Sequence, residues 1–321
     1  MDRLSEYTVI TKEIWIMIHY KAFQWLFFFY MYCFFGWCFE SAWVSFKSRK
    51  WVNRGFMRGP FLPLYGSGAI MMLVVSMPFQ DNVLLTYFAG VVGATVLEYI
   101  TGVTMEALFK VRYWDYSNRP FNFRGHICLT SSIAWGFLTI LMTRVVHRPI
   151  SDFILSLPGR AVVYVTALVT IYMVMDFTLS FKAALDLRDI LAKMQRIKEE
   201  MERMSRRLDV IIAFNNEEKE QKKQERELSL SELSMGIKQR FASLKEIIQL
   251  KPAEYGENIR EEVAELRGKF SHYLDPQENY KEILDFYKRD MIRNNPGMVS
   301  RTFKNVLEEL KNIAGRGDRG G

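Results

Sequence analysis

Cysteine, proline and histidine are scarce in this sequence: its 321 residues include three cysteines, nine prolines and four histidines. The cysteines (Cys33, Cys38 and Cys128) form no Cys-x-x-Cys pair and so indicate neither a disulfide framework nor a zinc knuckle. The chain has no Gly-x-x-x-x-Gly-Lys-Ser/Thr loop, no His-Glu-x-x-His pair and no Gly-x-Ser-x-Gly, the signatures of P-loop ATPases, zinc proteases and serine hydrolases. We predict no catalytic residue and no cofactor, and we assign no metal.

Charged residues are scarce in the first 181 residues, which hold 25 of them, whereas the remaining 140 residues hold 54. The mean hydropathy of −0.05 therefore averages an apolar part and a polar part. With 49% hydrophobic residues, the chain is not of the disordered class. The net charge of +7 is too evenly spread for a nucleic-acid-binding module, so we predict no nucleic-acid partner.

Five stretches of the apolar part are long enough to cross a bilayer, which takes about 20 mostly apolar residues. They are Ala22–Phe46, Leu62–Phe79, Val83–Phe109, Ile127–Val146 and Ala161–Phe181. The second is the weakest because it begins with Pro63 and soon reaches three small residues. Since no alternating strand pattern occurs anywhere, we predict an all-α, polytopic membrane helix bundle of about five spans over residues 22–181.

Basic residues predict the orientation of this bundle. The loops after the first and third stretches carry nine Lys and Arg residues, against six in the N-terminal segment and the other loops. We therefore expect a multi-pass protein of the plasma membrane, with its N-terminus outside and its C-terminal tail in the cytoplasm. Within residues 1–21, Ile10, Ile14 and Ile18 recur at helical spacing with Trp15 and suggest an interfacial helix.

The polar part is also helical. Residues 182–229 read as a long charged helix with heptads, and residues 230–321 as a cytoplasmic helical tail. One core position of the heptads takes Leu187, Met194, Met201 and Leu208, and the other takes Ile190, Ile197, Met204 and Ile211. Two interpretations stay open: a helix that continues the fifth span and packs on its own tail, or a coiled coil that forms a homodimer through residues 187–211.

Acidic residues inside the predicted spans are functional candidates, because a charge in the bilayer is costly. Glu98 and Glu106 are eight residues apart and share a broad helix face. The loop of residues 53–68 is so rich in glycine and proline that its backbone must line protein or water. The candidate pocket residues are Glu40, Arg54, Arg58, Glu98, Glu106, Asp115 and Asn122.

These residues allow a structural and a functional interpretation. In the first, the acids pair with arginines and fix the helix packing. In the second, they form a polar pocket facing the inner leaflet, which takes a cation or the anionic headgroup of a lipid. Glu40, Glu98 and Glu106 could together hold a divalent ion, and arginines could bind phosphate through two hydrogen bonds.

Two series of motifs resemble a known family. The first is Gly36-Trp37 with Glu40, then Asn53-Arg-Gly-Phe, Gly59-Pro60 and Pro63-x-Tyr65-Gly66. The second is Leu97-Glu-Tyr-Ile-Thr-Gly102 with Glu106, then Trp114-Asp-Tyr116, Phe121-Asn122 and Gly125-x-Ile127-Cys128. Over residues 25–145 the chain resembles the bacterial membrane family labelled putative ABC-transporter type IV. The resemblance implies a multi-span, permease-like protein. Any ATPase partner would be a separate subunit, because the chain has no nucleotide motif.

Three functions are consistent with the sequence. The first is a transport-related membrane subunit with its polar site at the inner leaflet. The second is a membrane-embedded enzyme that acts on a lipid phosphate headgroup. The third is a membrane-anchored scaffold or sensor that works through its helical tail.

Overall fold

The computed structural model describes residues 20–213, 229–250, 257–273, 284 and 286–316, and the chain divides into two units. The first unit comprises residues 1–185 with Tyr287–Arg301, and the second comprises Asp186–Phe286 with Thr302–Gly321. The predicted all-α class is confirmed. The strands of the described part are β1 (Asn122–Phe123) and β2 (Ile127–Cys128), an antiparallel hairpin too short to give a sequence pattern.

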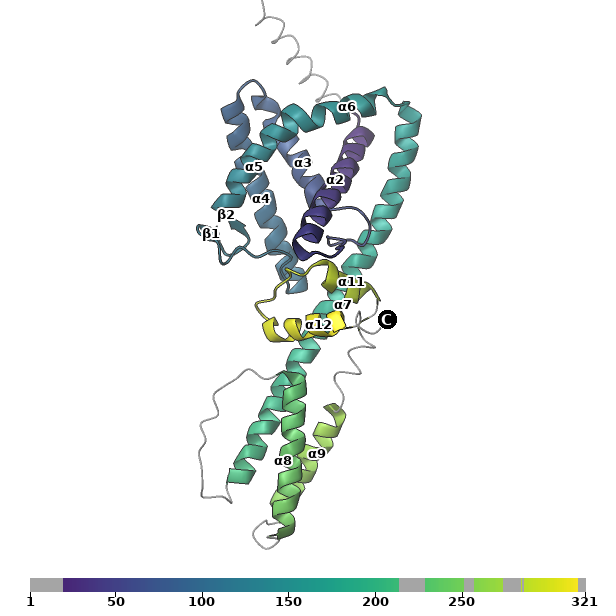
Figure 1. Cartoon of the computed structure of the whole chain (residues 1–321). Coiled ribbons are helices and arrows are strands. Elements are labelled where there is room, and N and C mark those ends of the chain that lie inside the picture. The colour runs from purple at the N-terminus through teal and green to yellow at the C-terminus, as the bar shows by residue number, and fades with distance from the viewer. Residues whose placement is uncertain (1–19, 214–228, 251–256, 274–283, 285, 317–321) are drawn as a thin grey trace, which may run out of the picture. The chain divides into compact units, whose positions relative to one another are not determined.

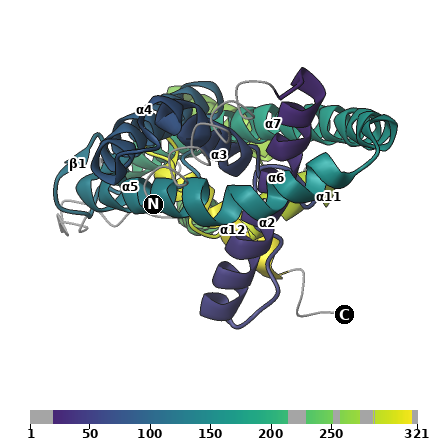
Figure 2. The same cartoon turned by 90° about the horizontal axis from the view of Figure 1, so that it is seen from above.

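The first unit is a group of helices that run between the same two ends (Figure 1). They are α2 (Ala22–Ser48), α3 (Pro63–Ser76) with the 3-10 turn Met77–Phe79, α4 (Val83–Phe109), α5 (Leu129–Leu141), and the first part of α7 (Gly159–Ala213). A π-helical turn, Met142–Val146, joins α5 to α6 (His147–Ser156). Figure 2 looks down on this group and shows α6 lying across it.

Four helices of the described residues are long and apolar enough to cross a membrane: Ala22–Ser48, Val83–Phe109, Leu129–Ser156 and Gly159–Ile212. The remaining predicted span, Leu62–Phe79, is present as the shorter apolar helix Pro63–Phe79. The helix predicted to end at Val146 continues to Ser156. The π turn precedes Pro149, which lacks an N–H and would clash with a carbonyl of a regular helix, and the wider turn accommodates it.

The core of the first unit lies between its helices and includes polar side chains. Phe28 and Leu73 are fully buried in it. Tyr32 shares a hydrogen bond of 2.6 Å with Nδ1 of His147, so the buried imidazole is satisfied. Where α4 meets α5, a Cβ on Gly90 would overlap Thr139, and the glycine therefore permits close helix packing.

In the second unit, the C-terminal part of α7 lies alongside α8 (Leu230–Leu250) and α9 (Glu257–Tyr273), and α12 spans Lys304–Arg316 (Figure 1). An ion pair of 2.6 Å joins Arg240 to Asp209, linking α8 to α7. Helix α7 continues directly from the fifth predicted span, as one of the two interpretations expects. The homodimer through residues 187–211 stays a prediction.

Burial along α7 follows the first predicted heptad position and only part of the second, where Met204 is buried. The first core position is buried within the single chain at Leu187, Met194, Met201 and Leu208. At the second position, Ile190 and Ile197 are only half-buried, whereas their neighbours Leu191 and Lys198 are buried. The buried stripe of α7 is therefore displaced by one residue at these two positions.

Residues Tyr287–Arg301, which include most of α11 (Phe286–Asn294), belong to the first unit, although they lie between α9 and α12 of the second unit in the sequence. We call them the return segment. Val299 pairs with Arg112 in an antiparallel bridge, with N–H···O distances of 2.7 and 2.9 Å. The return segment falls inside the predicted tail of residues 230–321. At the other end of the chain, residues 1–19 of the predicted interfacial segment lie outside the described residues.

Candidate functional site

A cavity of about 500 Å³ lies within the first unit. Its wall comes from α2, α3, α4, α5 and α7, from the loops that follow α2 and α4, and from the return segment. Most of the lining residues are apolar or aromatic, and its charged residues are Glu40, Arg54 and Glu98. The volume falls in the range of small-molecule sites, and so does the combination of an apolar wall with a few polar groups.

Glu98 lies on α4 and is 5% exposed. Its carboxylate accepts hydrogen bonds from the Tyr116 hydroxyl (3.0 Å), Nε1 of Trp135 (2.9 Å) and Oγ of Ser131 (3.3 Å). All three donors are neutral, and no ion pair joins Glu98 to a basic side chain among the described residues. The carboxylate is therefore hydrogen-bonded, but a negative charge on it is not compensated by a neighbouring cation.

Glu40 and Arg54 face the same cavity. Tyr65 donates a hydrogen bond of 2.5 Å to Glu40, and Nε of Arg54 lies 3.9 Å from the Glu40 carboxylate. The Arg54 guanidinium also donates to Oδ1 of Asn295 (2.6 Å) and to the Tyr113 carbonyl (3.1 Å). Because its donors are directed to groups of the protein, Arg54 is not arranged to bind a phosphate through two hydrogen bonds.

Tyr116 connects the two acids electrostatically. Burial raises the pKa of its phenol, and the negative charges of Glu98 and, more weakly, of Glu40 raise it further. The hydroxyl therefore stays protonated at neutral pH and acts as a hydrogen-bond donor to Glu98.

Glu106 and Asp115 belong to a different cluster, which is centred on Arg112. The left-handed backbone of Lys110 (φ 58°) ends α4 and turns the chain back, so that Arg112 pairs with Glu106 at 2.7 Å and with Asp115 at 3.2 Å. Nε2 of His126 lies 3.0 Å from Glu106. Neither acid lines the cavity.

The charges of this cluster are balanced inside the protein. Burial would raise the pKa of the Asp115 carboxyl, but hydrogen bonds from Ser117 and the charge of Arg112 outweigh it and lower the pKa. Burial and Arg112 lower the pKa of His126, so the imidazole is neutral at pH 7 and Nε2–H donates to Glu106. Here the structural interpretation of the acids applies.

Asn122 holds its loop together. Its Nδ2 donates to the carbonyls of Ser117 (3.2 Å) and Arg119 (2.8 Å), and its Oδ1 accepts from the Gly125 amide (3.1 Å). Its hydrogen bonds shape the turn beside the short hairpin, and its side chain does not line the cavity.

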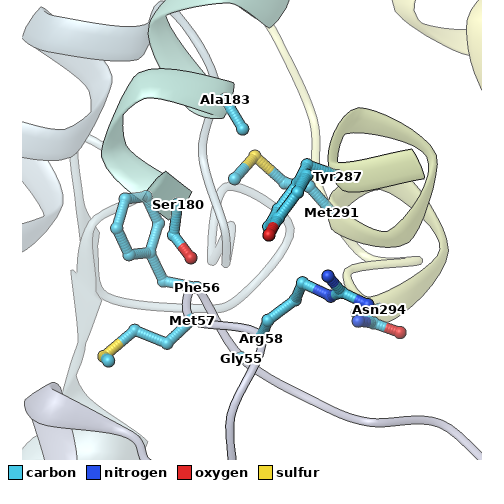
Figure 3. A pocket seen from close by; sticks show the side chains of 9 residues that line it. All are labelled: Gly55, Phe56, Met57, Arg58, Ser180, Ala183, Tyr287, Met291 and Asn294. Atoms are coloured by element: carbon cyan, nitrogen blue, oxygen red, sulfur yellow. The ribbon is translucent and has the colours of Figure 1, made fainter. Parts of the chain in front are cut away.

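Arg58 also lies away from the large cavity, beside a small pocket of about 10 Å³ where the loop after α2 meets α7 and α11 (Figure 3). It forms an ion pair of 3.3 Å with Asp290. Its guanidinium carbon lies 4.6 Å from the centre of the Tyr287 ring, a cation–π distance. Arg58 therefore joins the loop after α2 to the return segment.

Of the seven predicted site residues, the structure thus brings Glu40, Arg54 and Glu98 to one cavity. The three carboxylates that could have held a divalent ion are not brought together: in the described part of the chain, no three Asp, Glu, His or Cys side chains are grouped so that they could hold a metal ion. The physical reason is that α4 ends at Phe109, so that Glu106 meets Arg112 and not Glu98.

Sequence reasoning missed Tyr65, Tyr116, Trp135 and Asn295, all of which line the cavity. Tyr65 and Tyr116 stand inside the motifs that carry the family resemblance and could have been selected from them. Asn295 had no such signal, because it lies in an Asn-Asn-Pro-Gly stretch that indicates only a turn.

Residues 27–181 match the model of the family described as "Putative ABC-transporter type IV". The match confirms the resemblance and extends it through α5 and α6 to the apolar part of α7. No curated protein and no solved structure matches the chain.

Proposed function

We propose that this chain is the permease-like membrane subunit of a transport system. The proposal starts from residues 27–181, which match the family described as "Putative ABC-transporter type IV". The ligand site would be the cavity lined by Glu40, Arg54 and Glu98. An ATPase partner would be a separate chain, since the sequence has no nucleotide-binding loop.

One observation carries the proposal: Glu98 is buried at a cavity and has no basic partner in the part of the chain that the structure describes. A purely structural acid in a membrane helix is expected to be paired. Glu106, two turns further along the same helix, shows such pairing with Arg112 at 2.7 Å. Glu98 has a different environment, with a cavity beside it and only neutral donors around it.

The excess of basic residues in the loops after α2 and α4 favours one side of the membrane for the opening of the cavity. The loops after α2 and α4 both contribute to the cavity wall, through Arg54 and Tyr113 for example. These loops carry the excess of basic residues, which favours their placement in the cytoplasm. We therefore propose a site that opens toward the inner leaflet of the plasma membrane.

The proposal can be tested by metabolite accumulation in intact cells, which contain any ATPase partner. Cells without the gene would be complemented with wild type, Glu98→Gln or Asp152→Asn, and their metabolites compared by mass spectrometry. Asp152 is the matched control, because it is an exposed acid of α6 outside the cavity. At least one compound should depend on the wild type and on Asp152→Asn, and return to the deletion level with Glu98→Gln.

Two results would count against the proposal. If no compound depends on the wild-type gene, the transport role fails. If Glu98→Gln behaves like the wild type, Glu98 has no part in the mechanism. Immunoblots of the membrane fraction would show that all three proteins are present at equal levels.

A further inference from the structure

The charges at the cavity indicate which ligands it can take. Glu40 and Arg54 compensate each other at 3.9 Å, which leaves Glu98 as the group that determines the net charge of the site. Arg54 also donates to Asn295 and to the Tyr113 carbonyl. An anionic ligand would thus bring a second negative charge to a buried acid, whereas a cation would compensate Glu98.

The wall does not favour a bare metal ion as the ligand. Hard cations take six or more oxygen ligands close to the ion, and the described residues provide no cluster of acidic and histidine side chains. The cavity is instead lined by many aromatic side chains, of which Tyr65, Tyr116 and Trp135 donate hydrogen bonds to the acids. Aromatic rings attract organic cations through their π faces and bury apolar groups at the same time.

The size of the cavity agrees with this chemistry. A volume of about 500 Å³ is far larger than a single ion needs and fits an organic molecule. A carboxylate can accept about four hydrogen bonds, and Glu98 accepts three from the protein. Capacity for one further donor, such as an ammonium N–H, therefore remains.

We infer that the cavity binds an organic monocation with an apolar body, whose charge lies against the Glu98 carboxylate and whose body lies against the aromatic wall. The inference rests on the site of the proposed function and names its ligand class. It does not require that the ligand be moved across the membrane.

Equilibrium binding to the full-length protein in lipid nanodiscs tests the inference, with empty nanodiscs as the background. The probes are two cations of different size, benzyldimethylammonium, which carries an N–H, and tetraphenylphosphonium, together with the anion tetraphenylborate, which has nearly the same shape as tetraphenylphosphonium. At least one cation should bind about tenfold or more tightly than the borate. Glu98→Gln should weaken that cation about tenfold, the usual effect of losing a buried charged contact. Asp152→Asn should leave it unchanged.

The inference is overturned if neither cation binds more tightly than the borate, or if Glu98→Gln retains the wild-type affinity. Should Glu98→Gln fail to fold, the comparison of probes on the wild type needs no variant. Thr101→Trp would then test the location, because Thr101 lines the cavity one turn after Glu98 and a bulky side chain there should reduce cation binding.

The outcomes separate this inference from the proposed function. Cation binding that depends on Glu98, without any gene-dependent metabolite in cells, would support the inference and reject transport. Accumulation of a neutral or anionic compound that depends on Glu98, without cation binding, would reject the inference and leave transport intact.

Discussion

Replacement of Asn295 by alanine should weaken the contact between the return segment and the rest of the first unit. Asn295 is 1% exposed. Its Oδ1 accepts from Arg54 at 2.6 Å, and its Nδ2 donates to the carbonyls of Gly55 and Met291, both at 2.9 Å. The Met291 carbonyl belongs to the return segment itself, so one charged and one neutral hydrogen bond hold Asn295 to the loop after α2. Together these two contribute about 3 kcal/mol, of which water entering the site would restore a part. We expect a net loss of about 2 kcal/mol, or about 30-fold in the opening equilibrium of the segment.

Hydrogen exchange measured by mass spectrometry reports this opening directly. The Val299 amide donates to the Arg112 carbonyl at 2.9 Å, and the Arg112 amide donates to the Val299 carbonyl at 2.7 Å. Where amides exchange through local opening, their rate follows the opening equilibrium. In the Asn295→Ala variant, exchange of both amides should be about 30-fold faster than in the wild type.

Asn294→Ala is the matched control, because the side chain of Asn294 has no hydrogen-bond partner within the described residues while its neighbour has three. Its effect on exchange should be small. If Asn295→Ala left the exchange of Val299 unchanged, or if both variants accelerated it equally, Asn295 would not be what holds the return segment.

Two further predictions concern stability. Gly36→Ala should lower the unfolding temperature in detergent and weaken binding at the cavity. The reason is that a Cβ at position 36 would overlap Tyr65, which donates a hydrogen bond to Glu40. Gly68→Ala is the control: no atom lies within 4 Å of the new Cβ, so this variant should be neutral or stabilise its helix by up to about 1 kcal/mol. Equal losses in both variants would contradict this packing argument. Burial raises the pKa of the Glu309 carboxyl, although the Leu230 amide and the charge of Lys198 oppose the shift. Because the ionised form is less favourable in the folded protein, Glu309 lowers the free energy of unfolding as the pH rises through this raised pKa. Glu309→Gln should therefore raise the unfolding temperature above pH 7, with a difference that vanishes below the ordinary pKa of about 4.5, and a difference that grew toward low pH would refute the assignment.

Much of the membrane bundle could be predicted from the sequence, because a bilayer imposes a long apolar run on each helix. The predicted stretch Val83–Phe109 is α4 itself, and Ala22–Phe46 is extended by only two residues in α2. The prediction was weakest where the local signal was mixed. Arg144, His147 and Arg148 suggest a loop after Val146, but the chain remains helical to Ser156 through a π turn.

The site was only partly predictable, because hydropathy indicates which residues are buried and not which of them meet. Glu98 and Glu106 share a helix face, but the turn at Lys110 brings Arg112 to only one of them. Arg58 and Arg54 stand four residues apart in one loop and turn to different partners, Asp290 and Asn295. These pairings join residues far apart in the sequence, which no periodicity of a single segment reveals.

The return segment also determines when, during synthesis, the cavity can be completed. Asn295 follows Arg54 by 241 residues. At about 5–20 residues per second, the ribosome needs roughly 10–50 s to make that length of chain. Once the apolar part of α7 has been made, the helices of the membrane bundle are all present. Until the return segment follows, the Arg54 guanidinium lacks Asn295 and the Arg112 backbone lacks Val299. A premature stop codon between positions 186 and 286 would make this unfinished state permanent, giving a protein with all of its membrane helices but an incomplete cavity wall.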